Sequence, residues 1–431
     1  MKHFYHVLTN TLIANVTTSF LWFALTFWVY LETQSVLATG IIGGSYMLLV
    51  AIFSIFFGTI VDHYKKKTVM LASSIITLVC FGSAGMLYWL TTEQAILQLT
   101  SPLFWLFAGI ILVGGVVENM RNIALSTTVT LLVPKEAHAN ANGLVGTVQG
   151  IGFIVTSVFS GLAIGLLGMG WTLAIAITLT GVALIHLVFV SIPEKGVMHD
   201  PELANKKVDI KGSIAAIRVV PGLMALLIFS TFNNLIGGVY MALMDPYGLT
   251  LFSVEAWGMV FGVAGTGFVM GGLLVAKFGL GKNPIRTLLW MIVVMGLLGA
   301  LFTIREWWLL YAAGIWLYMV LIPVVESAEQ TVIQRVVPYK RQGRVFGFAQ
   351  AFEASAAPIT AFMIAPIAEF GIIPYMKSDA GQAQFGWLLG DGQARGIALV
   401  FFVAGLIMVA AALLAFLTKS YRRLSAHYGA A

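Results

Sequence analysis

Twelve long apolar stretches follow one another along this chain of 431 residues, and Lys and Arg gather in every second gap between them. A helix needs about 20 consecutive apolar residues to cross the hydrocarbon core of a bilayer. Soluble chains carry about a quarter charged residues, whereas here 59% of the residues are hydrophobic and 10% are charged. The sequence therefore predicts an all-α integral membrane protein with twelve transmembrane helices.

The distribution of positive charge predicts how these helices are oriented. Nineteen Lys and Arg residues fall in gaps on the side of the N-terminus, and three, Arg305, Lys377 and Arg395, fall in gaps on the other side. Loops rich in Lys and Arg stay in the cytoplasm, so both termini are predicted to be cytoplasmic. The expected helices cover residues 8–31, 37–61, 68–90, 102–132, 143–167, 170–192, 222–244, 253–276, 286–304, 307–337, 344–370 and 395–418.

One polar interval divides six spans from six. It contains PEKGVMHDPELANKKVDIKG, which cannot cross a membrane. We therefore predict an N-terminal six-helix bundle over residues 1–192, a cytoplasmic linker over 193–221 and a C-terminal six-helix bundle over 222–431. Within the linker, residues 210–219 are expected to form a short surface helix.

The two predicted bundles resemble one another. Pro134 and Gly143 are nine residues apart, as are Pro338 and Gly347, at an offset of 204 residues. Six spans are an even number, so the two halves have the same orientation and form a pseudo-symmetric pair. This plan is typical of transporters that rock about a substrate site between their halves.

A motif lies between the second and third spans, where Gly58 is followed by Asp62 and by the basic run Lys65-Lys66-Lys67. It resembles the signature loop of the major facilitator superfamily. The resemblance implies that superfamily's fold, and it implies that Gly58, Asp62 and Lys66 help to latch the two halves together on the cytoplasmic side. Arg344 is a candidate partner for Asp62. Alternatively, the lysines only set the topology.

A narrower resemblance covers roughly residues 110–170, including TVTLLVPKEAHANANGLVGTVQGIGFIVTS. This stretch is similar to bacterial efflux proteins of the macrolide-efflux and siderophore-exporter branch. The resemblance implies proton-coupled export from a bacterial cell, across its plasma (inner) membrane. The chain departs from the antiporter pattern in one respect, because its fifth span contains no proline, whereas Pro358 lies in the eleventh.

Two spans carry polar and ionisable residues where a charge is costly and commonly functional. Each span places three of them at i, i+3 and i+4, on one face of its helix: Glu118, Arg121 and Asn122 in the fourth span, and Glu326, Glu329 and Gln330 in the tenth.

Two carboxylates about 6 Å apart on one helix do not ionise together easily. We therefore predict that Glu326 and Glu329, with Glu353 of the eleventh span, hold and release a proton during transport. Glu118 and Arg121 would be their counterpart in the first half. A static alternative stays open, in which the acids form packing ion pairs: Glu118 with Arg121, Glu329 with Arg335, and Glu353 with Arg344.

The resemblance also implies a central cavity lined by the first, fourth, seventh and tenth helices. Amide, hydroxyl and aromatic side chains there would suit an amphipathic small molecule. The candidate substrate-cavity residues are Asn15, Thr18, Trp22, Gln149, Asn233 and Asn234.

The leading interpretation is a secondary transporter that exports amphipathic small molecules by alternating access, coupled to protons. Proton-coupled uptake, or movement of a lysolipid or a siderophore, is the alternative. An integral-membrane enzyme or a channel is a weaker one, since no nucleophile with a base and no filter-like loop stands out. No GxxxxGK[ST] sequence occurs, so ATP hydrolysis is not expected. We expect no cofactor, metal or nucleic acid, and a monomer whose partners are a small-molecule substrate, protons and the lipid bilayer.

Overall fold

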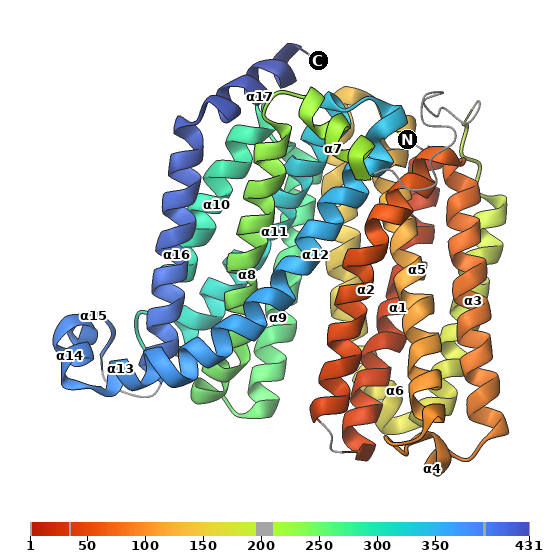
Figure 1. Cartoon of the computed structure of the whole chain (residues 1–431), viewed down its shortest axis with the longest axis horizontal. Helices are drawn as coiled ribbons and strands as arrows, with labels where there is room; N and C mark the ends of the chain where they lie inside the picture. The colour runs from red at the N-terminus through yellow and green to blue at the C-terminus, as the bar shows by residue number, and fades with distance from the viewer. Residues whose placement is uncertain (1, 34–35, 195–209, 391–393, 431) are drawn as a thin grey trace. The chain divides into compact units, whose positions relative to one another are not determined.

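The computed structural model describes residues 2–33, 36–194, 210–390 and 394–430, and all regular elements in these ranges are helical (Figure 1). Residues 195–209, which make up most of the predicted linker, lie outside them. A helix is present at Ile210–Val219, where the sequence predicted one. The first half contains α1 (Lys2–Thr33), α2 (Val36–His63), α3 (Lys66–Leu90), α4 (Glu93–Ile96), α5 (Pro102–Leu132), η1 (Lys135–Ala137) and α6 (His138–Phe189).

The short helix α7 precedes the second half, which ends with the amphipathic helix α17. The π-helical turn η4 lies between α12 and α13, and the π-helical turn η5 lies between α14 and α15. The elements are α7 (Ile210–Val219), α8 (Leu223–Leu251), α9 (Val254–Phe278), α10 (Pro284–Leu301), α11 (Trp308–Val336), η3 (Tyr339–Arg341), α12 (Gln342–Ile367), η4 (Ala368–Ile372), α13 (Ile373–Lys377), α14 (Asp379–Gly381), η5 (Gln382–Gly386), α15 (Trp387–Leu389), α16 (Ala394–Leu417) and α17 (Lys419–Ala430).

The helix α6 contains two of the predicted spans. Eleven helical stretches in the described ranges are long and apolar enough to cross a membrane, and one of them is the 55-residue stretch Lys135–Phe189. At 1.5 Å per residue this stretch is about 80 Å long, more than twice the hydrocarbon thickness. The backbone of Gly168 has φ 77° and ψ 175°, a conformation that glycine adopts without strain. Gly168 therefore divides α6 into two arms, and the predicted set of twelve transmembrane helices is confirmed.

The internal repeat is present in the backbone. After Pro134, one 3₁₀ turn (η1) leads into α6, and after Pro338 one 3₁₀ turn (η3) leads into α12. The backbone dihedrals of the two prolines nearly coincide, with φ −59° and ψ 147° at Pro134 and φ −56° and ψ 138° at Pro338. Both turns begin and end at positions that differ by 204 residues, which is the predicted offset.

The chain divides into two compact units. Unit 1 comprises Met1–His138, Ile151–Ala216 and Val337–Ala351, and unit 2 comprises Ala139–Gly150, Ile217–Val336 and Phe352–Ala431. The first turns of α6 thus belong to unit 2, and the first turns of α12 belong to unit 1. The sequence-based limits at residues 192 and 222 stay a prediction.

Unit 1 has an aromatic core at the end where α4 lies. The Trp28 and Phe107 rings meet edge to face at 5.7 Å, and the indole N–H of Trp28 donates to Glu93 Oε1 at 2.9 Å. Phe81 and Phe104 are fully buried beside them. Because large rings remove much apolar surface from solvent, this cluster holds α1, α3 and α5 together.

Unit 2 has its own aromatic core, formed by α8, α11 and α16. The rings of Tyr240 and Phe401 stack at 5.0 Å, and those of Tyr247 and Tyr311 lie 4.7 Å apart. The hydroxyl of Tyr311 donates to the carbonyl of Met244 at 2.7 Å, so this buried polar group is satisfied.

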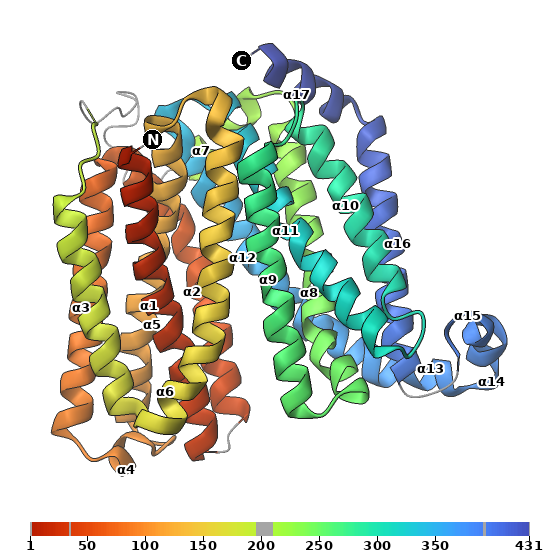
Figure 2. The same ribbon diagram turned by 180° about the vertical axis from the view of Figure 1, so that it is seen from behind.

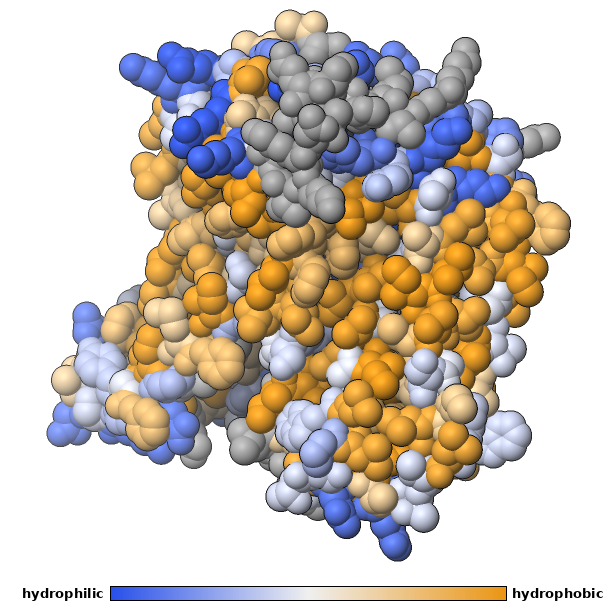
Figure 3. Space-filling view, turned by 45° about the vertical axis from the view of Figure 1, so that its right-hand side comes forward, coloured by the Kyte–Doolittle hydropathy of each residue, from blue (hydrophilic) through white to orange (hydrophobic). Residues whose placement is uncertain are grey.

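Exposed apolar side chains cover the flanks of the helices, and hydrophilic side chains gather at the helix ends (Figure 3). Leu48 on α2 and Val79 on α3 are 60% and 61% exposed, and Phe362 on α12 is 79% exposed. Contiguous apolar surface of this kind suits contact with lipid. The surface therefore agrees with a protein that crosses the membrane several times.

Candidate functional site

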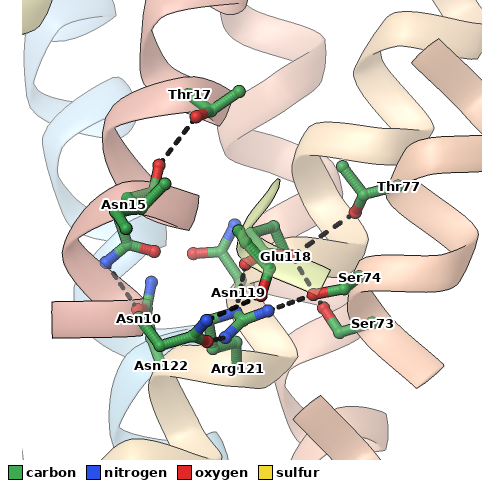
Figure 4. A network of polar contacts seen from close by, with 12 residues as sticks. Asn10, Asn15, Thr17, Ser73, Ser74, Thr77, Glu118, Asn119, Arg121 and Asn122 are labelled. Atoms are coloured by element: carbon green, nitrogen blue, oxygen red, sulfur yellow. Dashed lines mark hydrogen bonds and ion pairs between the residues drawn. The ribbon is translucent and has the colours of Figure 1, made fainter. Parts of the chain in front are cut away.

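In unit 1, the guanidinium of Arg121 is the centre of a buried polar network (Figure 4). Arg121 lies on α5 and is fully buried. It donates to Glu118 one turn away, to Asn10 on α1 and to Ser74 on α3. The expected ion pair between Glu118 and Arg121 therefore exists, and each of these contacts uses a different guanidinium nitrogen.

The side chains that bind Arg121 make further hydrogen bonds of their own. The second carboxylate oxygen of Glu118 accepts from Ser73 at 2.9 Å. The amide of Asn10 donates to the carbonyl of Ala183 at 2.7 Å and lies 3.2 Å from His186 Nδ1. The network thus joins α1, α3, α5 and α6. A buried ion pair with this many hydrogen bonds resists removal of either charge, which favours the static interpretation of this pair.

Three of the predicted cavity residues, Asn15, Thr18 and Trp22, lie on α1. Asn15 donates to the side chain of Asn122 at 2.9 Å, and Thr18 is buried. The Trp22 ring lies 5.2 Å from that of Tyr46.

An amide chain joins α12 to α5 and α2. Gln350 donates to Asn119 Oδ1 at 3.2 Å, and the amide of Asn119 lies 3.3 Å from the Tyr46 hydroxyl. This chain was not predicted, because Gln350 is distant in sequence from Asn119 and Tyr46.

In unit 2, three carboxylic acids on α11 and α12 lie close together. Glu329 is 8% exposed and lies near Glu353 and Ser230, and its Oε1 has no hydrogen-bond partner in the described structure. Glu326, one turn before Glu329 on α11, is exposed. Gln330, one residue beyond Glu329, is half-buried.

These acids have no cationic partner in the ranges that the structure describes. The ion pairs found there involve other acids. Arg335, the alternative partner for Glu329, instead places its guanidinium 4.7 Å from the centre of the Tyr428 ring. Within the same ranges no group of three or more His, Cys, Asp or Glu is placed to hold a metal ion. The acid cluster, defined as Glu326, Glu329 and Glu353, is therefore electrostatically uncompensated.

The acid cluster is not repeated in the first half. At the 204-residue offset, Glu326 corresponds to Asn122 (326 − 204 = 122) and Glu329 to Leu125 (329 − 204 = 125). Glu353 corresponds to Gln149, which is exposed. The two halves thus share a fold but differ in where they carry charge.

The predicted cavity residues of α8 lie in unit 2. Asn233 is half-buried, and its Oδ1 has no hydrogen-bond partner in the described structure. Asn234 is exposed and donates to the carbonyl of Ser230 at 3.2 Å. A ligand or water would have to satisfy the Asn233 carbonyl.

The carboxylate of Asp62, in the signature loop, lies at the N-terminus of α12. It accepts from the backbone N–H of Gly343 at 2.7 Å and of Arg344 at 3.0 Å, and Arg344 Nε lies 3.4 Å from Oδ2. A carboxylate at a helix N-terminus is stabilised by the helix dipole. Asp62 and Arg344 are therefore in contact, and their role as a latch stays a prediction.

Gly58, one turn before Asp62, allows this contact. A Cβ atom on Gly58 would overlap the carbonyl group of Gly343. Gly143 of α6 is equally close to the backbone of Ala276 on α9. In each case a glycine lets two helix backbones approach.

Lys66 makes a contact that the sequence analysis missed. It is 3% exposed, and its ammonium donates to the carbonyl of Val61 at 2.7 Å and lies 3.6 Å from Glu194 Oε1. The Tyr339 hydroxyl donates to Glu194 at 3.1 Å, and Lys66 Nζ lies 5.0 Å from the centre of the Tyr339 ring. The only indication of this cluster in the sequence was Glu194 itself, an acid that closely follows the sixth predicted span.

Arg395 also makes hydrogen bonds that the sequence did not predict. It is 1% exposed and donates to Glu306 at 3.0 Å, to the Thr303 carbonyl at 3.0 Å and to the Tyr247 hydroxyl at 2.7 Å. This arginine, counted by sequence as an outer-loop charge, therefore ties α8 and α16 to the connection between α10 and α11.

Comparison with known proteins identifies the family. The family model described as Major Facilitator Superfamily matches residues 7–361. The chain belongs to the Major Facilitator Superfamily. Members of this superfamily are membrane transporters and not enzymes, so this chain is a multi-pass membrane transporter.

Curated relatives of this superfamily member are bacterial efflux proteins. Macrolide efflux protein A of Streptococcus pyogenes is 23% identical over 381 residues, which cover 85% of this chain and 89% of the relative. Macrolide efflux protein A of Enterococcus faecalis is 24% identical over 324 residues, which cover 72% of this chain and 94% of the relative.

Solved structures share the superfamily fold. The proton:xylose symporter XylE superposes with a TM-score of 0.68 at 14% identity, covering 99% of both chains. A bacterial homologue of the iron transporter ferroportin, in an outward-facing state, superposes with a TM-score of 0.68 at 15% identity, covering 97% of this chain and 100% of the other. At these identities the likeness concerns the fold alone.

Proposed function

We propose that this superfamily member is a proton-coupled exporter of amphipathic small molecules that works by alternating access. Relatives named macrolide efflux protein, similar over most of their length, support export of molecules of that kind. We further propose that it resides in a bacterial plasma membrane with both termini in the cytoplasm, because Lys and Arg concentrate in the gaps on that side.

The observation that carries proton coupling is the uncompensated acid cluster. Glu329 is buried, and Glu326 and Glu353 interact with it. Negative charge on all three is costly without a counter-charge, because Glu329 is buried and the other two carboxylates lie close to it. A proton or a cationic part of a substrate would supply it, so the cluster can exchange one for the other during the cycle.

The network around Arg121 has a different role in this proposal. Its charges neutralise one another and its hydrogen bonds are filled, so it serves as a rigid frame for unit 1. Substrate contact in this unit is assigned to the neighbouring Trp22, Tyr46 and Asn15. Aromatic rings beside amide groups suit a molecule that is partly apolar and partly polar.

Transport in proteoliposomes tests the proposal. Glu329→Gln, Glu353→Gln and Glu326→Gln are each compared with wild type for uptake of a macrolide into inside-out vesicles under an imposed pH gradient. We expect at least one of them to lose pH-driven accumulation while retaining exchange of substrate without a gradient. Glu369→Gln is the matched control, because Glu369 is an exposed acid in η4. Full pH-driven transport by all three variants would contradict the proposal.

A further inference from the structure

One end of unit 2 carries a concentrated positive charge with no acid near it in sequence. The last turn of α9, the connection to α10, the first turn of α10 and the helix α17 supply the basic residues. Residues 271–304 and 394–430 contain no Asp or Glu. All of these basic side chains are exposed. They are Lys277, Lys282, Arg286, Lys419, Arg422 and Arg423.

The helix α17 holds its part of this charge in a defined orientation. Leu424 and Tyr428 are buried on one face, and the Tyr428 ring packs under the guanidinium of Arg335. Lys419, Arg422 and Arg423 stand at i, i+3 and i+4 on the opposite face. The basic face of α17, defined as these three residues, therefore points away from the unit.

A hydrogen bond joins α17 to the start of α10. The side chain of Asn283 donates to Ser425 Oγ, and the backbone N–H of Arg286 donates to Asn283 Oδ1 at 3.2 Å. Figure 2 shows α17 continuing from α16 at the same end of the unit as the start of α10. Arg286 and the basic face of α17 are thus fixed at the same end of unit 2.

Aromatic side chains lie directly beside these charges. Trp290, one turn after Arg286 on α10, is 46% exposed, and its ring lies 5.4 Å from that of Phe416. Phe416 in turn meets Tyr421 of α17 at 5.3 Å. Leu417 is 70% exposed next to them. Rings of this type mark the depth of the membrane interface, so apolar surface for acyl chains adjoins the basic end.

We propose that this end of unit 2 binds an anionic phospholipid. The phosphate group lies between Arg286 and the basic face of α17, and the acyl chains lie along Trp290, Phe416 and Leu417. Arginine binds phosphate through paired N–H donors. The adjoining exposed aromatic and leucine side chains favour a lipid over a soluble anion, because a soluble anion would leave this apolar surface unused.

Lipid retention and thermal stability test the proposal. The purified full-length transporter is relipidated with phosphatidylglycerol or phosphatidylcholine, and bound lipid is counted by native mass spectrometry. We expect wild type to retain phosphatidylglycerol in preference and to unfold at a higher temperature with it. Arg286→Gln combined with Arg422→Gln and Arg423→Gln should weaken this retention by about fivefold for each charge removed.

A matched control uses Lys211→Gln with Arg218→Gln, which removes two exposed basic residues of α7. It should bind phosphatidylglycerol like wild type. Trp290→Leu keeps every charge and removes the interfacial indole, so it should retain less lipid even if the triple variant does not fold. Equal retention of phosphatidylglycerol by wild type, the triple variant and Trp290→Leu would overturn the proposal, as would equal stabilisation by phosphatidylcholine.

Discussion

The two oxygens of the Glu194 carboxylate bind two different groups of Lys66. Oε2 accepts the backbone N–H of Lys66 at 2.7 Å, and Oε1 lies 3.6 Å from its ammonium. Both side chains are only 4% exposed. The first residues after α6 are therefore fastened to the start of α3, and the signature loop has a second buried ion pair beside that of Asp62 with Arg344.

This pair predicts a clear double-mutant cycle. Lys66→Met alone should lower the free energy of unfolding by about 3–5 kcal/mol, because it leaves a buried carboxylate without its counter-charge. Lys66→Met with Glu194→Leu should cost much less than the sum of the single changes. Unfolding in detergent by heat or denaturant measures both. Lys65→Met, at an exposed neighbour, is the control, and simple additivity of the two single changes would contradict the prediction.

The close approach of α2 and α12 predicts opposite effects at two glycines of α2. Gly58→Ala should destabilise the protein by about 1–3 kcal/mol, since the added methyl group overlaps the Gly343 backbone. Gly43→Ala meets nothing within 4 Å and should be neutral or stabilising by up to about 1 kcal/mol, because alanine favours the helix. Thermal unfolding of the two variants side by side checks this. Equal stability of the two variants would show that the helices separate easily.

The network around Arg121 predicts a loss of stability without a change in coupling. Arg121→Gln or Glu118→Gln should lower the free energy of unfolding by about 3–5 kcal/mol, because each leaves the partner charge buried and unpaired. The protein that still folds should show the pH dependence of wild-type transport. The measurement is transport per folded molecule over a range of pH. A pH profile altered in Glu118→Gln would instead assign a proton to Glu118.

The contacts of Arg395 predict that lysine cannot replace it. Arg395→Lys should cost about 2–3 kcal/mol, because one ammonium cannot reach Glu306, the Thr303 carbonyl and the Tyr247 hydroxyl together. Glu306 is 48% exposed, so Glu306→Gln should cost less than about 1 kcal/mol. Unfolding measurements compare the two. If Glu306→Gln proved the more damaging, the ion pair would outweigh the buried hydrogen bonds.

Much of the fold could be predicted because membrane insertion leaves a strong local signal. Apolar stretches of the length of a bilayer located every transmembrane helix, and the offset between Pro134 and Pro338 located the repeat. The merging of two spans in α6 was not predicted, since a single glycine, Gly168, makes the turn and no polar loop marks it.

The candidate site was only partly predictable. Residues on one helix face, such as Glu118 and Arg121, could be paired from their spacing alone. Most contacts between distant segments could not, and Gln350 with Asn119 and Glu194 with Lys66 are examples. Arg335 shows the limit most plainly, because nothing local to α11 indicated that a tyrosine 93 residues later would lie beneath its guanidinium (428 − 335 = 93).

The entry into α6 and the entry into α12 bear on how such a chain diverges after duplication. His138 Nε2 lies 3.1 Å from the carbonyl of Val133, and Gln342 Nε2 lies 2.9 Å from the carbonyl of Val337. An imidazole and a carboxamide thus contact the equivalent backbone carbonyl, five residues earlier in the chain, at equivalent positions of the two halves. Comparisons that score letter identity count this pair as a mismatch, so ancestry between the halves of such proteins is better traced by the carbonyl each side chain reaches than by the side chain itself.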